Sequence, residues 1–373
     1  MQHRSVSNLT ELELAAIDSG LNLADGHARY ELTASQQKII DRLGDLFAQA
    51  ADTLPGLLDQ QAQSAFLAAV GQHAAISDAE VLSCYSSSVA MEIFARALQA
   101  SDIRNVALMH PTFDNIPDIL RGVGMNLIPM SEDGLLDASG TLPKGAQVLF
   151  ITTPNNPTGR VLGPEELTYW ARECASKGAI LVLDSSFRGF DERAQYDHYA
   201  ILAREGCRYV IMEDTGKLWA TLDLKIGFLA FSRNEELPLH RIYTDILLGV
   251  SPLLMLMIKQ FAEDARDGGF AELHRFIHSN RTLLRKQFAG IPEIGVPEED
   301  SRISVEWLAL SDDYVGSEIW HALHQRSVHV LPCRQFFWAD PESGERYIRL
   351  ALSRPPEMIR AGAAAIRNYI EVG

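Results

Sequence analysis

Short apolar runs rich in β-branched residues recur along the middle of the chain, and each ends in a polar turn. They lie at residues 106–109, 147–151, 180–183 and 209–212. Stretches with helical periodicity separate them, of which Pro164–Lys177 is the clearest. Strands that are apolar throughout and alternate with helices predict a mostly parallel sheet covered on both faces. The sequence therefore predicts an α/β fold.

The pattern changes after about residue 270. A helix over residues 273–288 is followed by strands near 303–308, 328–331 and 347–352, with helices near 317–324 and 356–370. This order predicts a smaller α+β domain. We therefore divide the chain into an N-terminal arm (1–28), a large domain (29–270) and a small C-terminal domain (271–373), against which the arm can pack.

Three further segments suggest local structure. Thr10 and Glu13 have capping-box spacing, which predicts a helix that starts with Thr10 as its N-cap and ends near Gly20. The apolar positions in residues 35–50 fall on one face and predict one amphipathic helix. The apolar segment 246–258 is too short for a membrane span and predicts a buried helix or a subunit interface.

Composition narrows the function classes. The 373 residues carry 33 Lys+Arg and 49 Asp+Glu, a formal net charge of −16, which disfavours a nucleic-acid partner. The four cysteines form no CxxC pair, which indicates reduced thiols rather than a disulfide framework or a zinc site. The N-terminal twenty or so residues have no apolar core, so we expect no signal peptide, no membrane partner and a cytoplasmic location.

Candidate chemistry lies just after the strands, because ligands bind at the carboxyl ends of parallel strands. The serines at 86–88 open a helix and suit an anion, although taken alone they are better explained as a plain N-cap. Asp184 ends an apolar strand, where a carboxylate needs a cationic partner. Phe113 alone indicates only a core aromatic. Lys217 alone indicates a surface lysine, unless it is a Schiff-base lysine.

The joint order of these motifs is more specific than any one of them. Along the chain it reads Ser-Ser-Ser, Pro-Thr-Phe, Asn-Asn-Pro-Thr-Gly, a strand ending in Asp, Asp-Thr-Gly-Lys with a second Lys eight residues on, and a late Tyr-Ile-Arg-Leu. This order resembles the fold-type I transferases that use pyridoxal 5′-phosphate (PLP) and have the aspartate aminotransferase-like fold. The resemblance covers nearly the whole chain.

The resemblance implies a role for each matching position. Lys217 would carry the cofactor as a Schiff base and move the substrate Cα proton. Asp184 would pair with the pyridine nitrogen, Asn156 would bind the ring oxygen, and Phe113 would stack on the ring. Ser86, Ser87, Ser88 and Lys225 would hold the phosphate. Arg349 would bind the substrate α-carboxylate with its two-pronged guanidinium.

Three positions depart from the usual family pattern. Lys225 stands where the family usually has Arg, so charge is kept and bidentate geometry is lost. Phe187 stands beside the cofactor where a Tyr usually donates to the ring oxygen. Asp214 replaces a phosphate-binding Ser, and because a carboxylate repels a phosphate dianion, it suggests a basic substrate side chain.

The arm narrows the resemblance to one branch. Thr-Glu-Leu-Glu at 10–13, Asp-Gly-His at 25–27, Phe187, Glu-Asp-Thr-Gly-Lys at 213–217 and Leu-Asp-Leu-Lys-Ile-Gly-Phe at 222–228 resemble the PLP- and oxygen-dependent L-arginine oxidases/hydroxylases of enduracididine-type antibiotic biosynthesis. The resemblance implies dioxygen as co-substrate. It also implies oxidation of L-arginine to 4-hydroxy-2-oxoarginine and 2-oxoarginine with ammonia and hydrogen peroxide, the hydroxyl coming from water.

That branch implies a substrate site and a second catalytic residue. Its substrate contacts would be Thr10, Glu13, Asp25, Gly26, Asn156, Asp214 and Arg349. His27 would position water, since its ordinary pKa lies near neutrality. No metal is expected, and a homodimer with active sites at the subunit interface is. Two alternatives stay open: an aminotransferase or lyase for a basic amino acid, and a PLP-binding DNA regulator, which the charge disfavours.

Overall fold

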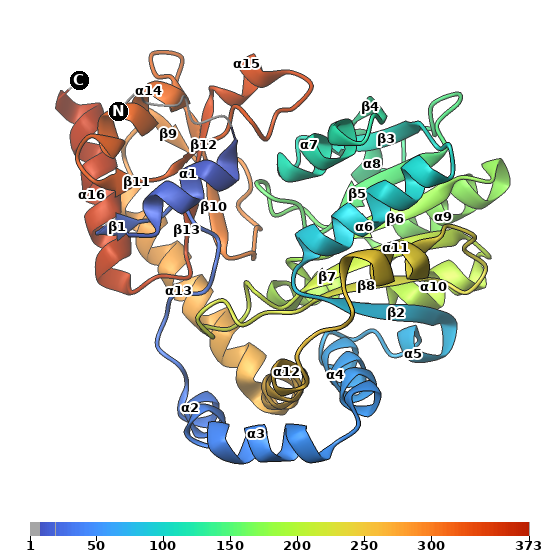
Figure 1. Ribbon diagram of the computed structural model, residues 1–373. Helices are drawn as coiled ribbons and strands as arrows, with labels where there is room; N and C mark the ends of the chain where they lie inside the picture. The colour runs from blue at the N-terminus through green and yellow to red at the C-terminus, as the bar shows by residue number, and fades with distance from the viewer. Residues whose placement is uncertain (1–7, 19, 373) are drawn as a thin grey trace, which may run out of the picture.

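The computed structural model describes residues 8–18 and 20–372, and it contains two main sheets joined by a long helix (Figure 1). The larger sheet has the order β2-β8-β7-β6-β5-β3-β4, and its only antiparallel member among the described residues is β8. The smaller sheet has the order β12-β13-β10-β9, and its three neighbouring strand pairs are antiparallel. The predicted α/β class is confirmed.

The strands follow the apolar runs closely. Those of the large sheet are β2 (Ala79–Cys84), β3 (Asn105–His110), β4 (Asn126–Ser131), β5 (Val148–Thr152), β6 (Ile180–Asp184), β7 (Arg208–Asp214) and β8 (Gly227–Ser232). Those of the smaller sheet are β9 (Ile294–Gly295), β10 (Val305–Leu310), β12 (Leu331–Pro332) and β13 (Tyr347–Ala351). A separate parallel pair joins β1 (Leu21–Asn22) to β11 (Val328–His329).

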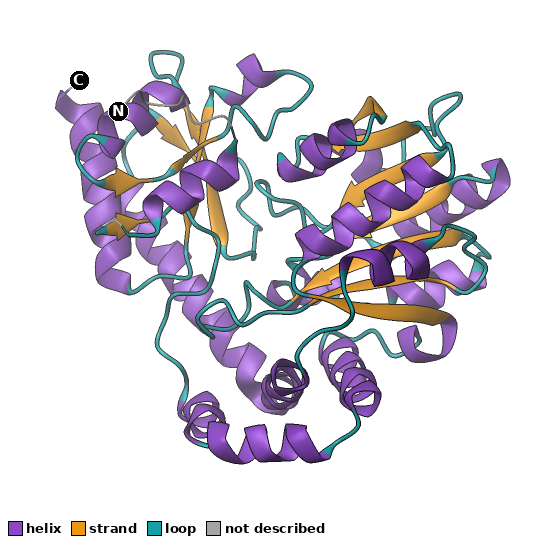
Figure 2. Cartoon of the chain, viewed as in Figure 1, coloured by secondary structure: helices purple, strands orange, loops and turns teal. Residues whose placement is uncertain are grey.

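Helices cover the sheets and link the domains (Figure 2). In the arm and large domain they are α1 (Leu9–Ala16), α2 (Ala34–Asp41), α3 (Leu43–Asp52), α4 (Pro55–Ala69), α5 (Ala75–Asp78), α6 (Ser87–Ala100), α7 (Asn115–Gly122), α8 (Glu132–Leu136), α9 (Pro164–Lys177), α10 (His198–Arg204), α11 (Leu239–Ile246) and α12 (Pro252–Asp264). The later ones are α13 (Phe270–Phe288), α14 (Gly316–His324), α15 (Pro341–Gly344) and α16 (Pro356–Val372). Two short 3-10 helices, η1 (Arg188–Phe190) and η2 (Glu192–Ala194), follow β6, and a π-helix, η3 (Ala265–Gly269), joins α12 to α13.

Both faces of the large sheet are buried, as near-continuous apolar strands require. Alternate residues of each strand enter different cores: Val182 packs with α6, α7 and α11, whereas Leu181 and Leu183 pack with α9 and α10. Because β2 runs in the same direction as the parallel strands, the carboxyl ends of β2, β5, β6 and β7 meet at one edge of the sheet. The loops that leave this edge carry the candidate chemistry.

The arm packs with the small domain. Leu9, Leu12 and Ala16 of α1 form a cluster with Leu331 and Phe336, and β1 pairs with β11. The domain boundaries after residues 28 and 270 stay a prediction, and residues 1–7 of the arm lie outside the described part of the chain. Among the described residues, no helix is both long enough and apolar enough to cross a membrane.

Two helix predictions were wrong. Asn8, not Thr10, caps α1: its side chain accepts from the Glu11 amide at 2.9 Å, and this start turns Leu9 and Leu12 toward the small domain. The single helix expected over residues 35–50 is two, because the backbone leaves the helical region at Arg42 (φ −103°, ψ 18°).

The apolar segment 246–258 is also divided. Leu248 lies fully exposed in the loop between α11 and α12, whereas Leu256 and Ile258 of α12 are buried. The buried helix we expected therefore exists, but it starts only at Pro252 and packs against α4.

Candidate active site

A cavity of about 190 Å³ lies at the carboxyl edge of the large sheet and is closed on one side by the arm. The structure brings to it every predicted site residue except Asp25, which contacts His27 from outside the lining. The lining residues are Thr10, Glu13, Gly26, His27, Ser86, Ser87, Ser88, Phe113, Asn115, Thr152, Asn156, Asp184, Ser186, Phe187, Asp214, Lys217, Lys225 and Arg349. Their roles stay predictions.

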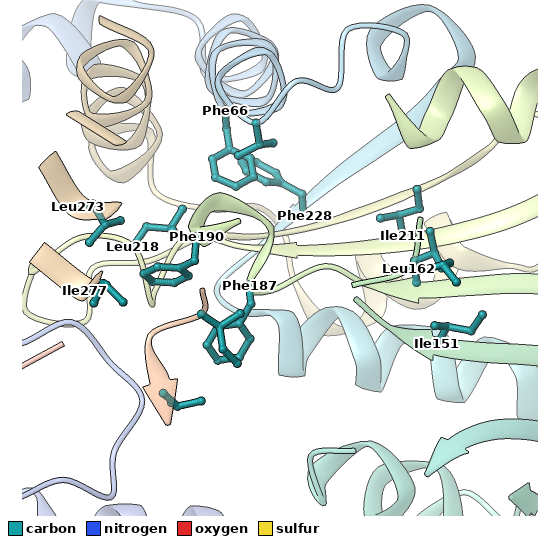
Figure 3. Packing of buried hydrophobic residues seen from close by; sticks show 14 of the residues in the cluster. Phe66, Ile151, Leu162, Phe187, Phe190, Ile211, Leu218, Phe228, Leu273 and Ile277 are labelled. Atoms are coloured by element: carbon teal, nitrogen blue, oxygen red, sulfur yellow. The ribbon is translucent and has the colours of Figure 1, made fainter. Parts of the chain in front are cut away.

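Lys217 lies among two carboxylates and an aromatic ring. Its Nζ is 5.1 Å from the centroid of Phe187, and it interacts electrostatically with Asp184 and Asp214. Phe187 belongs to the loop after β6 and is buried; its neighbour Phe190 packs beside Leu218 (Figure 3). The ring of Phe187 offers an apolar surface below the amine and no hydroxyl donor.

Asp184 is held rigidly at the end of β6. One carboxylate oxygen accepts from the Ser186 hydroxyl at 2.6 Å and from its amide at 3.0 Å. Burial raises the pKa of Asp184, while Ser186 and the charge of Lys217 oppose that rise. A buried carboxylate with a raised pKa is stabilised by a nearby cation, which a protonated pyridine ring would provide.

The three serines at 86–88, here called the serine loop, differ in their hydrogen-bond partners. The Ser86 hydroxyl accepts from the Val89 amide at 3.2 Å, and the Ser88 hydroxyl accepts from the Asn115 side chain at 3.2 Å. Since a hydroxyl has one proton to donate, Ser86 and Ser88 can still donate to an anion. Ser87 differs, because its hydroxyl (2.7 Å) and amide (3.1 Å) both face the carboxylate of Asp214.

Asp214 is therefore already bonded within the protein. Besides Ser87, its carboxylate accepts from the Gly216 amide at 2.5 Å. Burial alone would raise the pKa of Asp214, but the charge of Lys217 and the bonds from Ser87 and Gly216 hold this pKa below its ordinary value. Asp214 is thus an anion at neutral pH, and its predicted contact with a substrate cation stays a prediction.

Two glycines allow this close packing. A Cβ at Gly227 would lie 2.3 Å from the backbone carbon of Ser86, so only glycine lets β8 approach the serine loop. A Cβ at Gly216 would lie 2.6 Å from Lys225 Cδ. Both glycines lie in motifs quoted from the sequence, but neither was given this role, because only the folded chain shows how closely Ser86 and Lys225 approach them.

The arm delivers His27 to the cavity with both ring nitrogens engaged. Nδ1 lies 2.6 Å from Asp25 Oδ1, and Nε2 lies 2.9 Å from Lys225 Nζ. Burial opposes ionisation of Asp25, but hydrogen bonds and charge from His27, with the charge of Arg354, hold the pKa of Asp25 well below its ordinary value. An ionised Asp25 accepts a hydrogen bond from Nδ1–H, and in that tautomer Nε2 is the acceptor.

Glu13 of α1 reaches Arg349 across the cavity. Its Oε1 lies 3.2 Å from Arg349 Nη2, which also donates to the Ala24 carbonyl. Arg349 is 1% exposed, and its Nε has no hydrogen-bond partner among the described residues. The guanidinium predicted to bind a substrate carboxylate is thus held by a carboxylate of the arm.

The arm is also tied to the large domain. The Leu9 amide, at the start of α1, donates to Asp114 Oδ2 at 2.7 Å. Burial raises the pKa of Asp114 to about 7, against the hydrogen bond from Leu9. Nearby, the Thr112 amide donates to the Phe336 carbonyl at 3.1 Å. These contacts hold the cavity closed.

The residues present fit a PLP cofactor. Asn156 Oδ1 is buried without a partner among the described residues, as expected if its amide faces a ligand atom. Asp184 and Lys217 lie in the same cavity, and Ser86 and Ser88 keep free donors beside Lys225. Sequence reasoning missed Asn115, Thr152 and Ser186, although the position of Ser186 two residues after a strand-end Asp is typical of such side-chain turns.

Comparison with known proteins identifies the family. The profile described as aminotransferase class I and II matches residues 18–366. The chain belongs to this family. It is therefore an enzyme of the PLP-dependent aminotransferase superfamily, and the predicted fold type is confirmed.

Individual members of the superfamily are similar to different degrees. A structure of MppP soaked with the product 2-ketoarginine is 48% identical, with a TM-score of 0.91 over 94% of this chain and 100% of that one. An aminotransferase from Mycobacterium tuberculosis (18% identity, TM-score 0.75, 98% and 96% covered) shares the fold. Histidinol-phosphate aminotransferase from Citrobacter koseri is 27% identical over 169 residues, 44% of this chain and 45% of that protein. The chain thus matches under half the length of such curated relatives.

Proposed function

We propose that this enzyme oxidises L-arginine with dioxygen and uses PLP as its cofactor. The products are 2-oxoarginine and 4-hydroxy-2-oxoarginine, with ammonia and hydrogen peroxide. For the simple ketone, one dioxygen and one water are consumed and one peroxide is formed. The hydroxylated product needs a second dioxygen, which takes the second electron pair and gives a second peroxide, and a second water, which supplies the hydroxyl.

The observation that carries the proposal is the arm carboxylate of Glu13 in one cavity with Lys217 and Arg349. A zwitterion with a cationic tail satisfies both members of the Glu13–Arg349 pair at once: its carboxylate takes Arg349, and its guanidinium takes Glu13. The similarity to MppP, whose structure was soaked with the product 2-ketoarginine, supports the same substrate class.

The chain's own residues account for the proton movements. When bound, PLP withdraws the electron pair released at the substrate Cα. The Lys217 amine removes the Cα proton, and ionised Asp184 stabilises positive charge on the cofactor ring. Asp25 holds Nδ1 of His27, and Nε2 accepts from Lys225 in the substrate-free structure. When Lys225 turns to the cofactor phosphate, Nε2 becomes free to orient water. The closed arm excludes bulk water until this step.

A transamination of a basic amino acid is the second candidate, favoured by the family and by the histidinol-phosphate aminotransferase relatives. Absorbance spectra of the holoenzyme with L-arginine, recorded with and without oxygen, separate the two. The oxidase needs no oxo-acid acceptor, and its spectrum changes when oxygen is admitted. Stoichiometric build-up of pyridoxamine phosphate, insensitive to oxygen, would favour transamination. The homodimer, the cytoplasmic location and a place in antibiotic biosynthesis stay predictions.

A further inference from the structure

Arg354 follows β13 and is a buried guanidinium that the proposed reaction does not use. It is 0% exposed, and it stands behind the arm rather than in the cavity lining. Its Nε donates to the Asn22 carbonyl at 2.6 Å, and Nη1 donates to the carbonyls of His27 at 2.7 Å and Ser353 at 2.9 Å. Nη2 donates to the Asp25 carbonyl and lies 3.6 Å from Asp25 Oδ2. A buried charge needs such partners, because its desolvation is costly.

Arg354 is itself anchored from the opposite side. The Asn280 side chain of α13 donates to the carbonyls of Leu352 and Arg354, both at 2.8 Å. On the arm, Asn22 Oδ1 accepts from the amides of Ala24 and Asp25, both at 3.1 Å. Residues 22–27 therefore form a tight loop around the guanidinium of Arg354. The backbone of Arg354 is fixed in turn to the long helix α13.

The loop ends at His27, so Arg354 affects the position of the His27 imidazole ring in two ways. It fixes the His27 carbonyl directly, and it stabilises the negative charge on Asp25. Asp25 in turn accepts from the His27 amide at 2.9 Å and contacts Nδ1 at 2.6 Å. With Asp25 ionised, Nε2 of His27 faces Lys225 and the cavity as an acceptor.

We propose that Arg354 is a positioning residue that sets the orientation and the tautomer of His27, and so determines how much of the product is hydroxylated. This inference rests on the proposed function. A lysine would keep the charge but not the planar fork that spans several carbonyls, so Arg354→Lys should loosen the arm without emptying the cavity.

The test compares three holoenzymes: wild type, Arg354→Lys and Arg281→Lys. Arg281 is the matched control, because it is 5% exposed, lies in the small domain, pairs with Glu306 and donates to the Val305 carbonyl, away from the arm. In Arg354→Lys we expect the ratio of 2-oxoarginine to hydroxylated product to rise about tenfold. Amide hydrogen exchange of residues 21–28 should become about tenfold faster. The absorbance of the Lys217-bound cofactor should not change, and Arg281→Lys should keep the wild-type ratio.

A further variant isolates the route through His27. In an Arg354→Lys/His27→Ala enzyme, the product ratio should equal that of His27→Ala alone, because no ring is left to position. Three results would overturn the proposal. Arg354→Lys could keep the wild-type product ratio, or Arg281→Lys could shift the ratio equally. The effects of Arg354→Lys and His27→Ala on the ratio could also add in the double variant. If Arg354→Lys does not fold, Asp25→Asn must shift the ratio in the same direction, and an unchanged ratio there would overturn it.

The outcome is separable from that of the proposed function. If wild-type enzyme takes up no oxygen with L-arginine, the proposed function fails. Hydrogen exchange of residues 21–28 in the substrate-free Arg354→Lys holoenzyme then decides the positioning claim by itself. Faster exchange there, with no change in Arg281→Lys, supports it, and unchanged exchange overturns it.

Discussion

Replacing Glu13 by Gln probes how the cavity selects its substrate. In the structure Glu13 is paired with Arg349 at 3.2 Å, and their side chains are 15% and 1% exposed. L-Arginine would exchange this one ion pair for two, because it brings a carboxylate for Arg349 and a guanidinium for Glu13. L-Citrulline has the same length but an uncharged end. Its carboxylate would therefore displace Glu13 from Arg349 without giving Glu13 a new cationic partner.

The magnitude follows from the burial of this pair. A hydrogen bond to a charged group contributes about 1.5–3 kcal/mol, so Glu13→Gln should weaken L-arginine binding by about 10- to 100-fold. The same change should leave L-citrulline binding unchanged or tighter, because Arg349 loses its competing anion. The arginine-to-citrulline affinity ratio should therefore fall by about 10-fold or more.

The assay is an anaerobic absorbance titration of the holoenzyme with each amino acid. Glu11→Gln is the matched control, since Glu11 lies on the same helix and is exposed outside the cavity lining. Control and wild type should bind both ligands alike. If Glu13→Gln weakens both amino acids by the same factor, or leaves L-arginine unaffected, Glu13 does not contact the guanidinium and the reasoning is refuted.

Three other substitutions test two residues of the site and one buried carboxyl outside it. Lys217→Ala should abolish turnover and the absorbance of the covalently bound cofactor, and visible absorbance like that of wild type would exclude this lysine. His27→Ala should shift the product toward 2-oxoarginine, as mass analysis would show; an unchanged ratio would remove its role in orienting water. Burial raises the pKa of Glu132 to about 7, so this carboxyl keeps its proton up to a higher pH in the folded than in the unfolded chain. Wild type should therefore lose about 2 kcal/mol of stability between pH 5 and pH 8 through this group. Glu132→Gln can still accept hydrogen bonds from Thr158 and Asn155. Thermal melts at pH 5 and pH 8 should show that this variant does not lose the stability that wild type loses through Glu132.

The strand-end motifs were predictable because each consists of a short apolar run followed directly by polar residues. An apolar run that ends in Asp184 or in Glu-Asp-Thr-Gly-Lys marks a strand and its following loop, and parallel strands bring such loops to one edge. The order of the motifs then carried the resemblance to the PLP family. Gathering of Ser86, Asp184 and Lys217 in one cavity follows from this topology.

The remaining features depend on contacts between distant segments. Arg354 reads as an ordinary charged residue after a strand, and only the folded arm shows that it holds Asn22 and His27. The bond between Ser87 and Asp214 joins the start of α6 to the end of β7, two segments for which sequence reasoning predicted separate roles, phosphate binding for Ser87 and substrate binding for Asp214. The cap of α1 was misplaced for a related reason, because the burial of Leu9 against the small domain determines where that helix starts.

Oxygen consumption tests the central claim most directly. Holoenzyme, L-arginine and air are combined in a closed vessel without any oxo acid, and dissolved oxygen, peroxide, ammonia and oxoarginine products are measured together. Continuous oxygen uptake is expected, with one peroxide for each 2-oxoarginine and two for each hydroxylated product. No oxygen uptake, together with turnover only when an oxo acid is added, would contradict the account.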